Sequence, residues 1–288
     1  MRGKAALGER LLFRGHSNKS FSASPSVFRT PEWAQAEDKM LKQLLARHPN
    51  DFERDRTALE KMVRAQHYGL PTRLLDVTRN PLVALYFACS SNKQNETREA
   101  TGEVIVFSPS SKRQKYFDSD TISCLTNLGF LSSEQRESLQ AHLLKTYEEA
   151  FVAFPADKDE FQKRWADLFN DAEKNENILR LSQLVSQERP GFHPKINPRD
   201  LANVYAVVPR ILNKRIAAQD GEFLVYGFDL SPEDHFFVES IELQEVYISG
   251  SKKTQILEEL RALVISHENL FPEISNSADF IKSSFAKK

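Results

Sequence analysis

The chain has 288 residues, of which 40% are hydrophobic and 27% are charged. This composition is typical of a soluble globular protein with one large domain or two small ones, and it excludes disorder of the whole chain. The formal net charge of −1 gives no overall basic footprint for nucleic acid.

The first part of the chain alternates short apolar runs with helical patterns. Leu11–Phe13 is expected to be a strand, and Glu32–Arg47 has apolar residues at helical spacing. Thr57 followed by Glu60 is typical of a capping box at the start of a helix. That helix is expected to end near Gly69-Leu70-Pro71.

The middle of the chain contains one buried helix, one strand and a long charged segment. Asn80-Pro81 is expected to be an N-cap and first helical residue, and Pro81–Cys89 is nearly all apolar. Glu103–Phe107 has the pattern of a strand. Residues 117–190 are predicted to form a mainly helical insertion within a single domain spanning residues 1–288.

Strand patterns return after Pro190 and precede two final helices. The Asp220-Gly221 pair indicates a hairpin turn. The last helices are expected at Lys252–Ile265 and Ala278–Phe285. Strands are expected at Val204–Val208, Arg215–Ala218, Phe223–Phe228 and Glu245–Ser249. Runs of strands separated by a helical segment favour the α+β class over a doubly wound parallel sheet.

Targeting and cross-linking signals are absent from the sequence. The N-terminal residues contain no signal-peptide run, and no stretch approaches the ~18 apolar residues of a membrane span. Cys89 and Cys124 form no CxxC pair. We therefore expect a cytoplasmic protein without a membrane partner, a disulfide framework or a metal site.

The segment Gln66–Asp76 is the most unusual part of the sequence, because polar and bulky residues surround a Gly/Pro turn. Arg73 and Asp76 are three residues apart and able to pair. One interpretation is a functional loop. The other is a structural corner, in which Arg73 and Asp76 form a buried ion pair while Gln66 and His67 satisfy the backbone.

Two further sites combine polar residues with expected strands. Arg14 follows an apolar run and precedes Gly15, a placement that suits a phosphate or carboxylate ligand. The alternative is that Arg14 pairs with an acid such as Asp76. In the second site, Gln219–Glu222, the Glu222 carboxylate is a candidate general base, and a solvated turn is the alternative.

Together these segments resemble the FRG domain, named for a Phe-Arg-Gly motif that stands here as Phe13-Arg14-Gly15. The resemblance covers nearly the whole chain apart from the helical insertion. The other residues that carry it are Gln66–Asp76, Asn80-Pro81, Ala84–Ala88, Arg215, Gln219, Gly221, Phe223 and Leu270-Phe271-Pro272.

The order of the segments is also similar to that of ADP-ribosyltransferases, which implies a split β-sheet core with flanking helices. By that resemblance Arg14, Glu222 and Gln219 are the expected catalytic residues, with Gln219 or Asp76 able to replace Glu222. The expected cofactor is NAD. The residues expected to bind it are Arg14, Gly15, His67, Tyr68, Thr72, Arg73, Asp76 and Tyr86, with Phe87 as a further aromatic wall.

Three functions follow from these readings. The first is a toxin or phage-defence effector that transfers ADP-ribose from NAD to a nucleic-acid (RNA or DNA) or protein acceptor. The second is a non-catalytic module that binds a nucleotide or nucleic acid and acts as a sensor. The third is a protein whose helices at 117–190 contact an antitoxin or chaperone partner.

Overall fold

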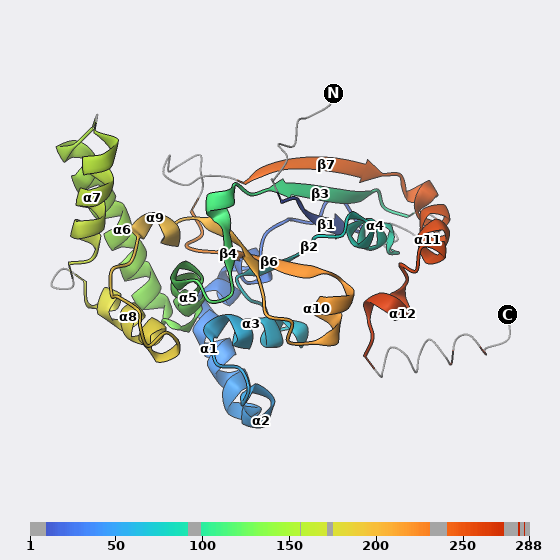
Figure 1. Ribbon diagram of the computed structural model, residues 1–288, viewed down its shortest axis with the longest axis horizontal. Helices are drawn as coiled ribbons and strands as arrows, with labels where there is room; N and C mark the ends of the chain where they lie inside the picture. The colour runs from blue at the N-terminus through green and yellow to red at the C-terminus, as the bar shows by residue number, and fades with distance from the viewer. Residues whose placement is uncertain are drawn as a thin grey trace.

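The structure is a computed structural model that describes residues 10–91, 99–155, 157–171, 175–230 and 241–273, together with Lys282 and Phe285. One curved seven-stranded sheet runs through it in the order β4-β5-β6-β2-β1-β3-β7 (Figure 1). Its strands are β1 (Leu12–His16), β2 (Leu74–Thr78), β3 (Gly102–Ser108), β4 (Gln114–Tyr116), β5 (Val204–Val208), β6 (Gly221–Tyr226) and β7 (Glu242–Ile248). A largely antiparallel sheet with separate helices agrees with the expected α+β class.

The sheet is weakly joined between β1 and β2. β1 pairs with β3 along its whole length, and β2 does the same with β6. Along β1 and β2, in contrast, the backbone pairs at Phe13 and Thr78 alone. We call this boundary the seam. Because no ladder continues past Phe13, side chains have to hold the two halves of the sheet together here.

Alternation along the strands defines the two faces of the sheet. Phe13, Asp76 and Thr78 share one face, which we call the helical face because the helices pack on it. Arg14 and Glu222 are at alternate positions of their strands, so their Cα–Cβ bonds point to the opposite face. That face carries a smaller apolar cluster that includes Leu12, Leu75, Val77 and Leu224.

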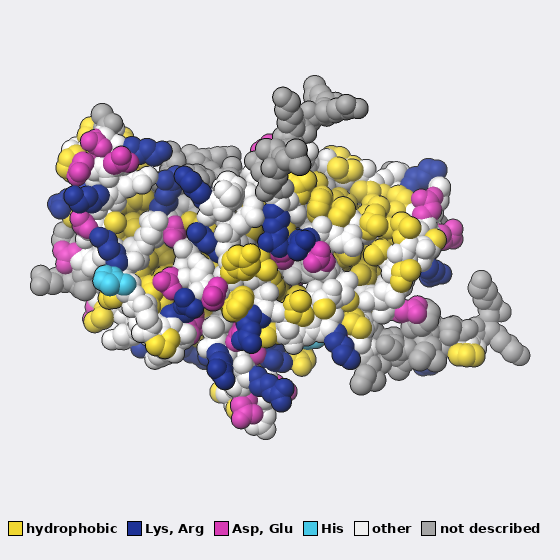
Figure 2. All heavy atoms as spheres, viewed as in Figure 1, with side chains coloured by type: hydrophobic (Ala, Val, Ile, Leu, Met, Phe, Trp, Pro, Cys, Tyr) yellow, Lys and Arg dark blue, Asp and Glu magenta, His cyan; other side chains and the backbone are white. Residues whose placement is uncertain are grey.

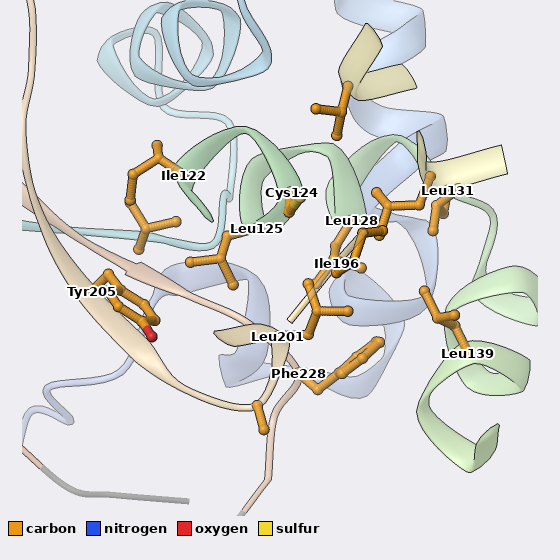
Figure 3. Close-up of a cluster of buried hydrophobic side chains, with 14 of the residues drawn as sticks. Ile122, Cys124, Leu125, Leu128, Leu131, Leu139, Ile196, Leu201, Tyr205 and Phe228 are labelled. Carbon is orange, nitrogen blue, oxygen red and sulfur yellow. The ribbon is translucent and has the colours of Figure 1, made fainter. Parts of the chain in front are cut away.

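The main hydrophobic core lies on the helical face, over β5 and β6. Figure 3 shows Leu125 and Leu128 gathered with Tyr205 of β5 and Leu139. The longer helices that contribute are α1 (Pro31–Arg47), α3 (Ala58–His67), α5 (Asp120–Asn127), α6 (Ser133–Ala153), α7 (Lys158–Phe169) and α8 (Glu176–Glu188). Within residues 117–190 the structure has the helices α5 to α8, and their side chains build this core, so deleting them would remove it.

α4 (Pro81–Cys89) covers the other half of the helical face. The Asn80 side chain accepts a hydrogen bond from the Leu82 N–H at 3.0 Å, which confirms the expected N-cap. Ala84 is fully buried against β1. A Cβ atom added to Gly15 would overlap the Ala84 carbonyl oxygen, so only glycine allows α4 to lie this close to β1.

The start of α3 also follows the sequence pattern. The Glu60 N–H donates to the Thr57 hydroxyl at 3.2 Å, and the Thr57 N–H donates to the Glu60 carboxylate at 3.3 Å. Both hydrogen bonds of the expected capping box are therefore present.

The expected strand at Arg215–Ala218 is wrong. These residues lie in α10 (Lys214–Ala218), because the Asn213 side chain caps its first turn and two alanines favour a helix. Asp220, with φ of 44°, joins α10 to β6, so Asp220-Gly221 is not a hairpin turn. β2 and β4 were not expected as strands, and the helix expected at Ala278–Phe285 falls outside the described residues except for Lys282 and Phe285.

On the face shown in Figure 2, acidic and basic side chains are mixed, and hydrophobic side chains gather near β3, β7 and α4. Leu243, Val246 and Tyr247 of β7 are among the exposed large hydrophobic residues. Of the helices that the structure describes, none combines the length and the apolar character needed to cross a membrane.

Candidate functional site

A cleft opens on the helical face where α4 and α10 leave the seam uncovered. Its volume is about 210 Å³. A smaller hollow of about 70 Å³ shares four of its lining residues and therefore adjoins it. The cleft is lined by Phe13, Arg14, Gly15, Asp76, Val77, Thr78, Val83, Phe87, Arg215 and Gln219.

Arg14 reaches the cleft across the seam. Its Nε donates a hydrogen bond to His16 Nε2 at 2.9 Å, and an Nη donates to the Asp76 carbonyl oxygen at 2.6 Å. Burial lowers the pKa of Arg14, and the nearby charge of Asp76 opposes that shift. The Arg14 side chain thus connects β1 to β2 where the backbone ladder is missing.

His16 fixes the Arg14 guanidinium. Because His16 Nε2 accepts from Arg14, Nδ1 carries the ring proton and donates to the Glu103 carboxylate at 3.3 Å. Burial and the positive charges of Arg14 and Arg29 lower the pKa of His16 to about 4. The ring is therefore neutral at neutral pH, as its acceptor role requires. His16 and Glu103 were not among the expected site residues, although His16 directly follows the Phe-Arg-Gly motif.

Asp76 presents its carboxylate to the cleft from β2. One carboxylate oxygen accepts a hydrogen bond from Gln66 Nε2 at 2.6 Å. The Gln66 amide oxygen in turn accepts from the Thr72 hydroxyl. Thr72 thereby sets which end of the amide faces Asp76. These contacts explain the positions of the polar residues in the Gln66–Asp76 segment. Thr72 is fully buried and positions Asp76 through Gln66.

Gln219 lines the cleft, whereas the Glu222 carboxylate starts on the opposite face. Glu222 is buried, with 4% of its surface exposed, and forms an ion pair with Arg10. Glu222 also borders the smaller hollow at the start of β6. Gln219 Nε2 donates to the Leu270 carbonyl oxygen at 3.0 Å. The backbone carbonyl oxygen of Gln219 accepts a hydrogen bond from the Thr78 hydroxyl at 2.6 Å.

Arg73 does not pair with Asp76 and does not line this cleft. Its guanidinium donates to both carboxylate oxygens of Glu37, at 2.9 and 2.5 Å, and to the Gly227 carbonyl oxygen at 3.0 Å. Phe28 covers its other side, with 5.7 Å from the guanidinium carbon to the ring centre. Arg73 is 2% exposed, so it acts as a structural residue.

The remaining expected residues divide between the hollow and the surface. His67 borders the smaller hollow, and its Nε2 lies 3.9 Å from the Glu273 carboxylate. Tyr68 is 65% exposed and lines neither cavity. Tyr86 also lies outside the lining of both, while its neighbour Phe87 borders the cleft.

Arg215 lines the cleft but was not among the catalytic or cofactor-binding residues expected from the sequence. Its guanidinium carbon lies 4.8 Å from the centre of the Phe271 ring. Phe271 also contacts Phe87, with 6.0 Å between ring centres, so the segment after α12 (His267–Leu270) borders the cleft. Arg215 is one of the residues that carry the resemblance to the FRG domain, which was a signal. The strand expected at 215–218, however, would not place Arg215 beside Gln219 as α10 does.

No group of three or more His, Cys, Asp and Glu residues that could hold a metal ion is present within the described ranges. The residues that line the cleft instead include two arginines, one carboxylate, one amide, one hydroxyl and two phenylalanines. Such a set can bind an anionic group, a hydroxyl or amide donor, and a flat or apolar surface.

No curated protein and no solved structure matches this chain. A family model, described as the FRG domain, matches residues 9–97. The matched segment contains β1, α3, β2 and α4, and with them Arg14, Gly15, Gln66, Asp76 and Phe87. The half of the cleft that β1, β2 and α4 supply is therefore similar to the FRG domain.

Proposed function

We propose that the chain transfers ADP-ribose from NAD to a nucleic-acid or protein acceptor, with the nicotinamide end of NAD in the cleft. The observation that carries this proposal is that Arg14 and an exposed carboxylate, Asp76, line one cavity. A transferase of this kind needs a guanidinium and a carboxylate at one place. The role as a toxin or phage-defence effector rests on the resemblance of the sequence alone.

The carboxylate in this proposal is Asp76. Glu222 does not line the cleft and is already paired with Arg10. Asp76, in contrast, is exposed in the cleft and is oriented by Gln66. The break in the ladder at the seam also supports the comparison with a split β-sheet core, because it separates the sheet between the strands that carry Arg14 and Asp76.

The chemistry assigns a distinct task to each group. When the bond between nicotinamide and C1′ of the ribose breaks, its electron pair leaves with nicotinamide and positive charge develops on the sugar. The Asp76 carboxylate stabilises that charge. An acceptor oxygen or nitrogen then bonds to C1′, and its proton passes to Asp76 and on to water.

The test uses two carboxylate-to-amide changes on opposite faces of the sheet. The purified protein is incubated with NAD labelled in the adenylate part and with lysate, and RNA, DNA and protein are then separated. We expect label in one fraction, reduced at least ~100-fold in Asp76→Asn, as is typical for loss of a general base. We expect Glu222→Gln to retain labelling within ~3-fold, well below that general-base effect.

The possible outcomes separate the two carboxylates. Label lost in Glu222→Gln but kept in Asp76→Asn, with both variants melting like the wild type, would move the carboxylate to Glu222. An absence of both label and NAD consumption in the wild type would refute the transferase.

A non-catalytic nucleotide-binding module is the second candidate. The observation that favours it is the size of the cleft, about 210 Å³, which is below the ~300–1,000 Å³ of common ligand pockets and encloses only part of a dinucleotide. This function predicts saturable binding of a nucleotide without release of nicotinamide. Isothermal titration with NAD, followed by chromatography of the same sample, distinguishes the two.

A further inference from the structure

We propose that Arg215 is the anion-binding residue of the cleft and takes the phosphate of a phosphorylated, hydroxyl-bearing ligand such as a nucleotide. The inference shares with the proposed function the entry of a phosphate compound into the cleft, but it requires no transfer reaction. It also reverses the expectation from sequence, in which Arg14 holds the phosphate.

The two arginines of the cleft differ in how many of their N–H groups already donate hydrogen bonds within the protein. Arg14 donates to His16 and to the Asp76 carbonyl oxygen, so two of its three nitrogens are engaged in holding the seam. For Arg215, the contact seen within the described part of the chain is with the face of Phe271. A face contact leaves the N–H groups at the edge of the guanidinium available for a ligand.

The position of Arg215 is fixed by its helix. Asn213 caps α10, and the buried Ile216 anchors the helix in the main core. Arg215 and Gln219 are four residues apart, which places them on one side of α10, and both line the cleft. The guanidinium is thus presented from a short but anchored element.

The segment that contains Phe271 holds the guanidinium in place. Gln219 binds the Leu270 carbonyl oxygen at 3.0 Å, and the Phe271 ring is stacked on His267, with 4.6 Å between ring centres. Phe87 contacts the same ring from α4. A side chain held before binding loses less conformational entropy when the ligand arrives, so affinity improves.

The distribution of charge selects the ligand class. Asp76 and Arg215 line the same cleft, yet the carboxylate of Asp76 is held by Gln66 and forms no ion pair with Arg215. The cleft therefore has a separate acceptor for hydroxyl groups and a separate donor for an anion. A phosphorylated sugar with free hydroxyls satisfies both, whereas a plain nucleoside satisfies one.

The experiment compares probes with and without phosphate by isothermal titration. ADP-ribose and ribose 5-phosphate serve as phosphate probes, and adenosine serves as the neutral probe. We expect Arg215→Gln to raise the Kd of both phosphate probes roughly 10- to 100-fold, as loss of a charge-assisted hydrogen bond implies, and to leave adenosine unchanged. Arg215→Lys should recover part of the affinity, and Phe271→Leu should weaken it several-fold through loss of positioning.

The matched control is Arg79→Gln. Arg79 lies close by, is about half exposed, and pairs with Asp220 at 3.9 Å outside the cleft lining. Its change should leave every Kd unaltered. Equal affinity of Arg215→Gln and wild type for ADP-ribose, or no saturable binding of either phosphate probe to the wild type, would overturn the inference.

Failure of this inference and failure of the transferase are distinguishable. Binding of ADP-ribose that depends on Arg215, without any release of nicotinamide from NAD, supports the anion site and refutes the transferase. Labelling that depends on Asp76, with a Kd for ADP-ribose that Arg215→Gln does not change, supports the transferase and refutes the anion site.

Discussion

Arg73 and Arg215 lie in two regions of the molecule that surround a guanidinium in opposite ways. Arg73 is buried, forms two hydrogen bonds with Glu37, donates to the Gly227 carbonyl and packs on Phe28. Arg215 is half-buried, rests on one aromatic ring and faces a cleft. A buried guanidinium with partners on all sides stabilises the fold, and we infer that one held on a single side can bind a ligand.

Removing the partner of Arg73 tests the first half of this comparison and should have the largest effect. Glu37→Gln leaves the buried Arg73 without its charge partner and should lower the free energy of unfolding by about 3–5 kcal/mol. Urea denaturation followed by circular dichroism measures this. A loss below about 1 kcal/mol would contradict the structural role, because breaking a buried ion pair costs more than that.

Arg14 is the intermediate case, and its partner His16 links it to pH. The pKa of His16 is about 4 in the folded protein and near 6.5 in the unfolded chain, so the unfolded state binds more protons between these values. Stability from this group is therefore complete above about pH 6.5 and is lost as pH falls to about 4. The loss amounts to about 3 kcal/mol.

His16→Gln isolates that effect, because glutamine accepts a hydrogen bond but does not titrate. Unfolding free energies of the wild type and the variant are compared from pH 7 to pH 4.5. Their difference should shrink as the pH falls. Parallel curves would show that His16 binds its proton equally in both states.

Thr72 connects the two kinds of region, because it is buried but controls the cleft through Gln66. Thr72→Val should cost about 1–2 kcal/mol of stability, since the Gln66 amide oxygen loses its donor. It should also reduce any NAD turnover roughly 10-fold or more through misplacement of Asp76. Thr72→Ser retains the hydroxyl and should restore turnover. Equal turnover in the valine and serine variants would show that the hydroxyl does not position Asp76.

Arg215→Gln should have the smallest effect on stability, within about 0.5 kcal/mol of the wild type in urea denaturation. The small expected change in the free energy of unfolding contrasts with that for the Arg73 pair, because Arg215 forms few contacts that stabilise the fold. A loss above 2 kcal/mol would place Arg215 in the same class as Arg73.

Local signals in the sequence predicted local structure well. The caps at Thr57 and Asn80 and the helix at Pro81–Cys89 were predictable because each depends on residues close together in the chain. α10 was missed because its alanines were read as a strand, although Asn213 was a cap signal. β2 was missed because most of its residues are buried on both faces, so period-two alternation does not appear.

The candidate site could be predicted in its ingredients but not in its geometry. Arg14, Asp76 and Gln219 do line one cleft. Which face Glu222 occupies depends on strand register, and the partner of Arg73 comes from α1, far away in sequence. The spacing of residues along one sequence does not show which distant segments pair. Neither the face of Glu222 nor the partner of Arg73 could therefore be predicted.

The position of β2 in the sheet also has a consequence for synthesis of the chain. Its partner β6 follows it only after the entire helical segment from α5 to α8. On a ribosome, β1, β3 and α4 emerge early and can associate, while β2 waits with an unpaired edge. Closing so long a loop is slow, so completion of the sheet should be a late event in folding. Until then the nascent chain has an exposed strand edge that is prone to aggregation.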